Sequence, residues 1–172
     1  MIRPRGGNFV YDNEEYMIMK KDVLACKELG CPGIATGILL ANGEIDSERM
    51  KEIVQIAHPM QVTCHKAFDA TPDAARSLES LIEAGCKRVL TSGLHATAIA
   101  GAKILAALVK QAAGRIIIMP GGSVRSSDIA ALIKETGAAE YHSSGLLIKG
   151  GNFIANEEEI RKMVCMASYN AN

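Results

Sequence analysis

Short apolar segments alternate along the chain with longer amphipathic segments, and glycines mark the boundaries between them. Four times, a glycine suited to the end of a helix is followed, seven or eight residues later, by a second glycine that closes a short apolar run. The first glycine fits the left-handed backbone just past a helix, where a Cβ is penalised, and the second is typical of a tight turn after a strand. The pairs are Gly30 and Gly37, Gly85 and Gly93, Gly114 and Gly121, and Gly137 and Gly145.

The segments between these runs have helical patterns. Apolar residues between positions 50 and 57 recur at i, i+3, i+4 and i+7, which places them on one face of a helix. Thr71 followed by Pro72 predicts a helix start. Asn156 with Glu159 three residues later has the pattern of a capping box and predicts another. Further helices are predicted over residues 16–29, 97–113 and 127–136.

The order of these elements predicts a parallel sheet. A further apolar segment, residues 61–65, keeps the spacing, so strands recur about every 24 to 32 residues, the length of one βα unit. Parallel neighbours need helical crossovers of this kind. With Met1–Arg5 as the end of another strand, we expect an α/β fold of the parallel (β/α)8 TIM-barrel type, incomplete, with about six of eight βα units in one partial domain, residues 1–172. An open doubly wound sheet is the alternative, disfavoured because no Gly-x-Gly-x-x-Gly follows a first strand.

Composition narrows the class of protein. Of 172 residues, 48% are hydrophobic and only 4% aromatic, as in an α/β core built from aliphatic side chains. Nineteen basic residues balance nineteen acidic ones, which argues against nucleic acid as a partner. No apolar run approaches the roughly 20 residues of a membrane-spanning helix, and the first residues lack a signal-peptide core, so we expect no membrane partner and a cytoplasmic location. The five scattered cysteines then indicate free thiols.

Barrels of this type place their chemistry where strands end and βα loops begin. His65 ends one predicted strand and Asp69 follows within one loop, a spacing that suits a carboxylate orienting an imidazole for acid/base catalysis. Arg3 and Arg5 share one face of the first predicted strand because side chains alternate, so they form a predicted clamp for an anion. A structural histidine and surface arginines are the alternatives.

The last predicted strand and the glycine turns add further polar groups. Glu140, His142 and Ser144 alternate onto one face, which would align a carboxylate, an imidazole and a hydroxyl. Burying such groups without partners is costly, so a polar cavity is favoured, with Glu140 and His142 as catalytic candidates. The turns at Gly121, Gly122 and Ser144 follow the last two strands, where barrels commonly bind phosphate on backbone amides. The same glycines also suit a plain turn.

Five segments, in order, resemble the successive signatures of the CutC copper homeostasis family. They are residues 2–11, 63–69, 88–93, 119–122 and 140–144. The resemblance implies a cytosolic (β/α)8 barrel linked to copper tolerance and Cu(I) binding, with a cleft at the carboxyl ends of the strands. It also adds Ser92, with the adjacent Gly93, to the anion-binding candidates. The residues that the resemblance assigns to the cleft are Arg3, Arg5, His65, Asp69, Ser92, Gly121, Gly122, His142 and Ser144.

The chain departs from the family pattern in three places. Asn8 stands where the family usually has Asp, and Lys66 where it often has Arg. The resemblance also implies two βα units and most of a third strand upstream of Met1, so the present units correspond to strands 3 to 8. The cysteines implied as Cu(I) ligands belong to those upstream units, so the metal ligands in this chain are unknown.

Three functional hypotheses follow. The first is a copper homeostasis protein of the CutC type that binds copper as Cu(I). The second is a TIM-barrel enzyme that acts on a small anionic or phosphorylated metabolite. The third is an inactive remnant, because a six-strand sheet leaves unpaired edges that invite pairing into a homo-oligomer or aggregation. The sulfurs of Met163, Cys165 and Met166 suit Cu(I), but gap filling in the core is the favoured interpretation.

Overall fold

A sheet of four parallel strands lies at the centre of the computed structural model, which describes residues 1–169. The strands are β1 Gly33–Thr36, β2 Gln61–Cys64, β3 Arg88–Thr91 and β4 Ile117–Pro120. They pair in the order β1-β2-β3-β4, so spatial neighbours are also consecutive in the sequence. Each strand is joined to the next by a helical crossover, which parallel pairing requires. The predicted α/β class and parallel arrangement are therefore confirmed.

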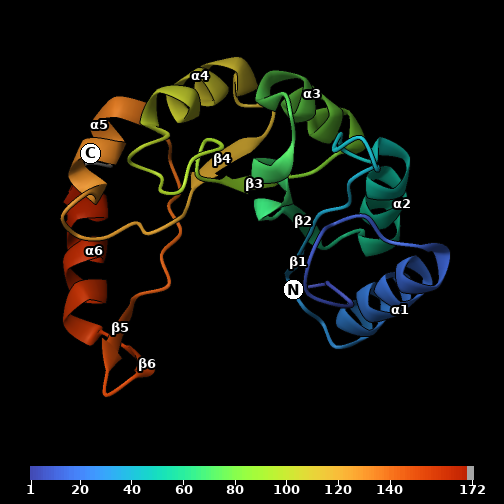
Figure 1. Ribbon diagram of the computed structural model, residues 1–172, viewed down its shortest axis with the longest axis horizontal. Helices are drawn as coiled ribbons and strands as arrows, with labels where there is room; N and C mark the ends of the chain where they lie inside the picture. The colour runs from blue at the N-terminus through green and yellow to red at the C-terminus, as the bar shows by residue number, and fades with distance from the viewer. Residues whose placement is uncertain (170–172) are drawn as a thin grey trace.

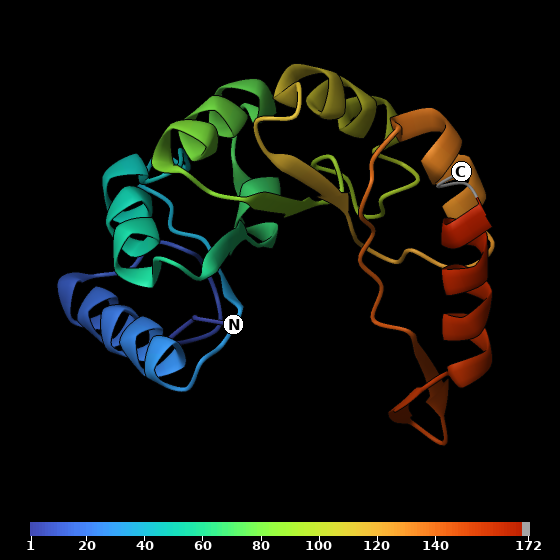
Figure 2. The same ribbon diagram turned by 180° about the vertical axis from the view of Figure 1, so that it is seen from behind.

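The helices form an arc around the outer side of the sheet, with the strands on the inner side (Figures 1 and 2). They are α1 Asn13–Glu28, α2 Ser47–Ala57, the 3₁₀ helix η1 Lys66–Ala70, α3 Ala74–Ala84, α4 Ala102–Ala112, α5 Ile129–Thr136 and α6 Glu157–Tyr169. The arc is open, with α1 at one end and α6 at the other, so the described sheet does not close into a barrel. Among the described helices, none has the length and apolar character to cross a membrane.

The core lies between the sheet and the helices. Alternate strand residues point outward and are buried against the helices, namely Ile34, Val62, Val89 and Ile118. Residues 35, 63, 90 and 119, one position further along each strand, are only half-buried because they face the inner side of the arc. Each buried aliphatic side chain stabilises the fold by about 1.5–3 kcal/mol. The outer face of the sheet therefore holds the molecule together, while its inner face stays accessible.

The first residues run beside β1 without forming the predicted strand. The Ile2 N–H donates to the Ala35 carbonyl at 2.8 Å, and the Thr36 hydroxyl donates to the Ile2 carbonyl at 3.1 Å. In a parallel ladder the next donor on this segment is residue 4, and Pro4 has no N–H. Pairing stops there, so the prediction of a strand at Met1–Arg5 is wrong.

The last predicted strand is reduced to one bridge. His142 pairs with Gly121 in parallel, and its N–H donates to the Pro120 carbonyl at 2.9 Å. The described structure has no strand over residues 141–145 beyond this bridge, so the prediction of a strand that ends at Gly145 is wrong.

An antiparallel hairpin follows these residues and forms a separate two-stranded sheet. It consists of β5 Leu146–Lys149 and β6 Asn152–Ala155. Gly150 and Gly151 form its turn with φ angles of 57° and 79°. A two-residue glycine turn between apolar runs is typical of hairpins, so the signal is present in the sequence. The parallel pattern of the other strands does not extend to it.

Helix α3 begins later than predicted. Thr71 does not cap it, because the Thr71 hydroxyl donates to the Phe68 carbonyl at the end of η1. Asp73 is the cap instead, and its carboxylate accepts the Arg76 N–H at 3.0 Å. The 3₁₀ helix after β2, which the sequence pattern does not predict, occupies the residues that would otherwise lead into α3.

Candidate functional site

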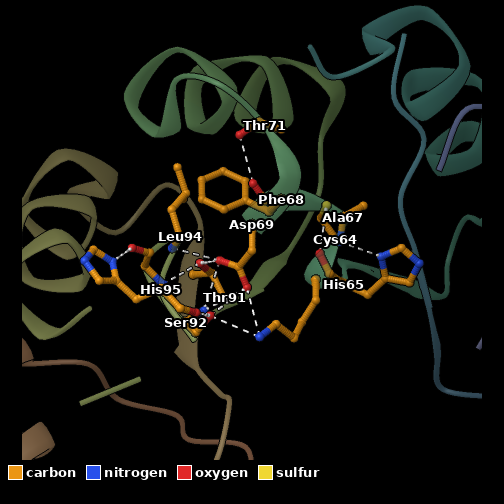
Figure 3. A network of polar contacts seen from close by, with 12 residues as sticks. Cys64, His65, Ala67, Phe68, Asp69, Thr71, Thr91, Ser92, Leu94 and His95 are labelled. Carbon is orange, nitrogen blue, oxygen red and sulfur yellow. Dashed lines mark hydrogen bonds and ion pairs between the residues drawn. The ribbon is translucent and has the colours of Figure 1, made fainter. Parts of the chain in front are cut away.

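Asp69 is the centre of a hydrogen-bond network at the carboxyl ends of β2 and β3 (Figure 3). It lies in η1, directly after β2, and its carboxylate reaches the loop after β3. It accepts hydrogen bonds from the Thr91 hydroxyl and from the Leu94 N–H, the latter at 3.1 Å. It also accepts from the N–H and the hydroxyl of Ser92, both at 3.0 Å. Asp69 therefore fastens the loop after β3 to the loop after β2.

The predicted pairing of Asp69 with His65 is not formed. The His65 imidazole lies away from Asp69 in Figure 3, and its Nδ1 accepts the Ala67 N–H at 3.2 Å. The reason is the 3₁₀ helix η1. The Ala67 N–H in this helix donates to the imidazole nitrogen, while Asp69 projects toward β3. Both residues lie at the predicted end of the strand, and their roles as acid and base stay predictions.

His65 is a buried, neutral imidazole. Its side chain packs against the Phe9 ring with the ring centroids 5.1 Å apart. Burial, with a smaller contribution from the Arg3 charge, lowers the pKa of His65 to about 4. Because Nδ1 accepts a hydrogen bond, the proton is on Nε2, which is buried and has no hydrogen-bond partner within the described residues. A Cβ on Gly37 would lie 2.7 Å from Nδ1, so glycine is required there for the close approach of the imidazole.

Arg3 and Arg5 point to different partners. Arg3 lies 4.6 Å from the centre of the Phe9 ring and donates to the Gly7 carbonyl at 2.6 Å. Arg5 turns to α1 and pairs with the Glu15 carboxylate at 2.5 Å. Because these residues form no regular strand, the two side chains do not share one face as predicted. Arg3 lies near His65, and Arg5 lies at the start of α1. Their anion-binding roles stay predictions, but not as a two-arginine clamp.

An open cavity of about 520 Å³ lies on the inner face of the sheet. Residues that line it include Thr63, His65, Arg88, Leu90, Met119 and His142. The structure therefore brings the two predicted histidines to one cavity. It also adds Arg88, which is not among the site residues predicted from the sequence. Arg88 shares the inward face of β3 with Leu90, so strand alternation was the signal that could have found it.

Glu140 is held by Arg88 at the amino end of β3. The two side chains form parallel hydrogen bonds of 2.6 and 3.0 Å, and Arg88 also donates to the Gln61 side chain. The hydrogen bond to Glu140 raises the pKa of Arg88. Such a bidentate pair fixes both groups. Glu140 thus has a structural partner, and its catalytic role stays a prediction.

Lys66 is a cation at the carboxyl end of the sheet and is not among the predicted site residues. Its ammonium donates to the Ser92 hydroxyl at 3.0 Å and lies 3.3 Å from the Asp69 carboxylate. A Cβ on Gly122 would lie 3.3 Å from Nζ, so the ammonium stands beside the turn after β4. The side chain is 44% exposed. We call Lys66, Asp69, Ser92 and Gly122 the mouth cluster, because it joins the loops after three successive strands.

The other predicted anion-binding residues are less available. The Gly93 N–H donates to the Thr91 hydroxyl at 2.9 Å, and Gly121 is paired with His142. Ser144 is exposed and lines a separate cavity of about 360 Å³ beside α5 and α6. The structure therefore does not bring Ser144 into the mouth cluster.

The described residues contain no group of three or more His, Cys, Asp or Glu side chains placed to hold a metal. All five cysteines are free. Cys64 and Cys86 are buried, and burial raises the pKa of both thiols, that of Cys86 to about 12. Met163 of α6 is buried in the core, as gap filling predicts, whereas Cys165 of the same helix is exposed.

Comparison with known proteins supplies the family context. The model of the CutC family matches residues 1–147. A family protein CutC from Parabacteroides distasonis is 48% identical over 144 residues, which cover 84% of this chain and 59% of the relative. One from Mesorhizobium japonicum is 49% identical over 146 residues, covering 85% and 57%. A crystal structure of a CutC protein from Streptococcus agalactiae has a TM-score of 0.78 at 36% identity, covering 82% of this chain and 69% of that one. The chain thus spans somewhat more than half the length of these curated relatives.

Proposed function

Because the chain belongs to the CutC family, we propose that it takes part in copper homeostasis in the cytoplasm by binding Cu(I) as its cargo. The matched residues 1–147 include the whole parallel sheet and the mouth cluster. The observation that supports copper is chemical, since all five thiols are free. Thiolate sulfur is the ligand type that selects Cu(I) over harder metal ions.

Anaerobic titration with Cu(I) tests this proposal. The reduced chain competes with a chromophoric Cu(I) chelator, and we expect one tight site per folded chain. The control is the same chain unfolded in guanidinium chloride, which presents the same thiols without the fold. Equal Cu(I) affinity of the folded and unfolded chains would contradict the proposal.

A second candidate function is binding of a small anionic or phosphorylated metabolite, and the position of Lys66 favours it. The ammonium stands beside the Gly122 turn, where barrels of this type commonly hold phosphate. Ser92 and Asp69 fix its position, so little side-chain freedom remains to be lost on binding. The half-exposed side chain leaves the ammonium open to a ligand.

Titration with inorganic phosphate, followed by NMR chemical shifts, tests this candidate. We expect saturable shifts at the mouth cluster and at least about a tenfold loss of affinity in Lys66→Gln, because a hydrogen bond to a charged group contributes about 1.5–3 kcal/mol. Lys103→Gln is the matched control, because Lys103 is exposed on α4. Unchanged affinity in Lys66→Gln would rule out this role for the ammonium.

A further inference from the structure

Helix α1 ends in a turn that brings its last residues against the residues before β1. The Cys31 N–H donates to the Cys26 carbonyl, and the Gly30 N–H donates to the Lys27 carbonyl, both at 3.0 Å. Gly30 has a φ of +72°, which glycine adopts without a Cβ penalty. These two bonds define a Schellman motif, in which the side chain of the third-last helical residue meets that of the second residue after the cap. Here both positions are cysteine.

The two thiols are neighbours and partly open to solvent. The turn places Cys26 and Cys31 next to each other, and both side chains are half-buried. Burial raises the pKa of the Cys26 thiol, and the adjacent Cys31 thiol raises it further. Cys26 is therefore protonated at neutral pH, and a metal ion must displace that proton.

We propose that Cys26 and Cys31 form a two-thiolate site for Cu(I) at the amino-terminal end of β1. This inference rests on the proposed copper function and assigns the residues that hold the ion. Each thiol releases its proton to solvent, and each sulfur donates an electron pair to copper, which stays Cu(I) throughout. The site lies at the opposite end of the strands from the mouth cluster.

The other thiols are less suited to this role. Cys64 and Cys86 interact with each other, but both are buried in the core, where a bound ion would lose its hydration. Cys165 is exposed on α6, outside the residues that match the family model. Zn²⁺ prefers four ligands, and the described residues offer no group of three or more, so the pair suits an ion satisfied by two sulfurs.

Cysteine variants of the whole chain test the assignment under the anaerobic chelator competition described above. Cys26→Ser and Cys31→Ser should each lower Cu(I) affinity by more than about 100-fold. Mutation of residues that only hydrogen-bond to metal ligands already lowers metal affinity about 10–100-fold, and loss of a ligand itself costs more. Cys165→Ser is the matched control and should keep the wild-type affinity. Circular dichroism melts establish that each variant is folded.

Alkylation with iodoacetamide gives a second readout that is independent of affinity. One equivalent of Cu(I) should protect Cys26 and Cys31 in the wild-type chain while Cys165 is still modified, and Zn²⁺ should give no protection.

The outcomes separate the assignment from the proposed function. If the folded wild-type chain binds Cu(I) no more tightly than the unfolded chain, both fail. If wild type binds tightly and the Cys26 and Cys31 variants match it, copper binding stands and this site is overturned.

Discussion

Replacement of Asp69 by alanine should destabilise the fold markedly. The carboxylate accepts the backbone N–H groups of Ser92 and Leu94, and Ser92 is fully buried. A buried donor left without a partner costs about 1–3 kcal/mol. The fully buried Ser92 carries this cost and the half-buried Leu94 adds less, so we expect a loss of about 2–4 kcal/mol in the free energy of unfolding. The lost ion pair with Lys66 adds little, because the Lys66 side chain is half-exposed and water screens its charge.

Urea unfolding followed by circular dichroism at pH 7 measures this loss. Asp69→Asn should cost about half as much, because an amide oxygen still accepts from both N–H groups but without the charge. It also serves if the alanine variant fails to fold, since folded domains have only about 5–15 kcal/mol in total. Asp22→Asn, on the exposed side of α1, is the control and should stay within about 0.5 kcal/mol. If Asp69→Ala unfolds within about 1 kcal/mol of wild type, the network does not hold the loops.

Two further predictions concern His65. Because burial lowers its folded-state pKa to about 4, the unfolded chain binds a proton that the folded chain does not between this pH and the ordinary value of about 6.5. The stability that depends on a neutral His65 is fully present above pH 6.5 and falls by about 3 kcal/mol toward pH 4. Urea midpoints should therefore fall more steeply with acid in wild type than in His65→Gln. Parallel curves for the two proteins would contradict this. Gly37→Ala should lower stability by about 1–3 kcal/mol in thermal melts, because its Cβ meets the imidazole at 2.7 Å. Gly6→Ala, with nothing within 4 Å, should be neutral, and equal melting of the two variants would refute the steric argument.

The repeating part of the fold could be predicted because it depends on local signals. Gly30, Gly85, Gly114 and Gly137 all have positive φ, as expected of glycines at helix ends. Capping was predictable in part. Asn156 does accept the Glu159 N–H at 3.2 Å, but the Glu159 carboxylate binds Ser126 instead of closing the capping box. The partner on α5's leading loop is 33 residues away in the sequence, and no local pattern reveals such a contact.

The location of the candidate site could be predicted from the sequence, but the hydrogen-bond partners of its residues could not. Strand ends brought His65, Asp69 and Ser92 to the carboxyl side of the sheet. Their partners depend on η1, whose geometry decides that Asp69 reaches β3 and that His65 turns back on its own loop. The proximity of Cys26 and Cys31 could not be predicted from their spacing alone, because it depends on the Schellman turn at the end of α1.

The turn that ends α1 recurs at the end of α3, where the Cys86 N–H donates to the Leu81 carbonyl at 3.0 Å. Backbone bonds alone bring those two positions together, so the identity of the side chains is free to vary without changing the turn. At the end of α3 the two positions hold Leu81 and Cys86, which are both buried in the core, whereas at the end of α1 they hold two half-buried thiols. The same backbone turn therefore supports core packing at the end of α3 and presents two solvent-accessible thiols at the end of α1.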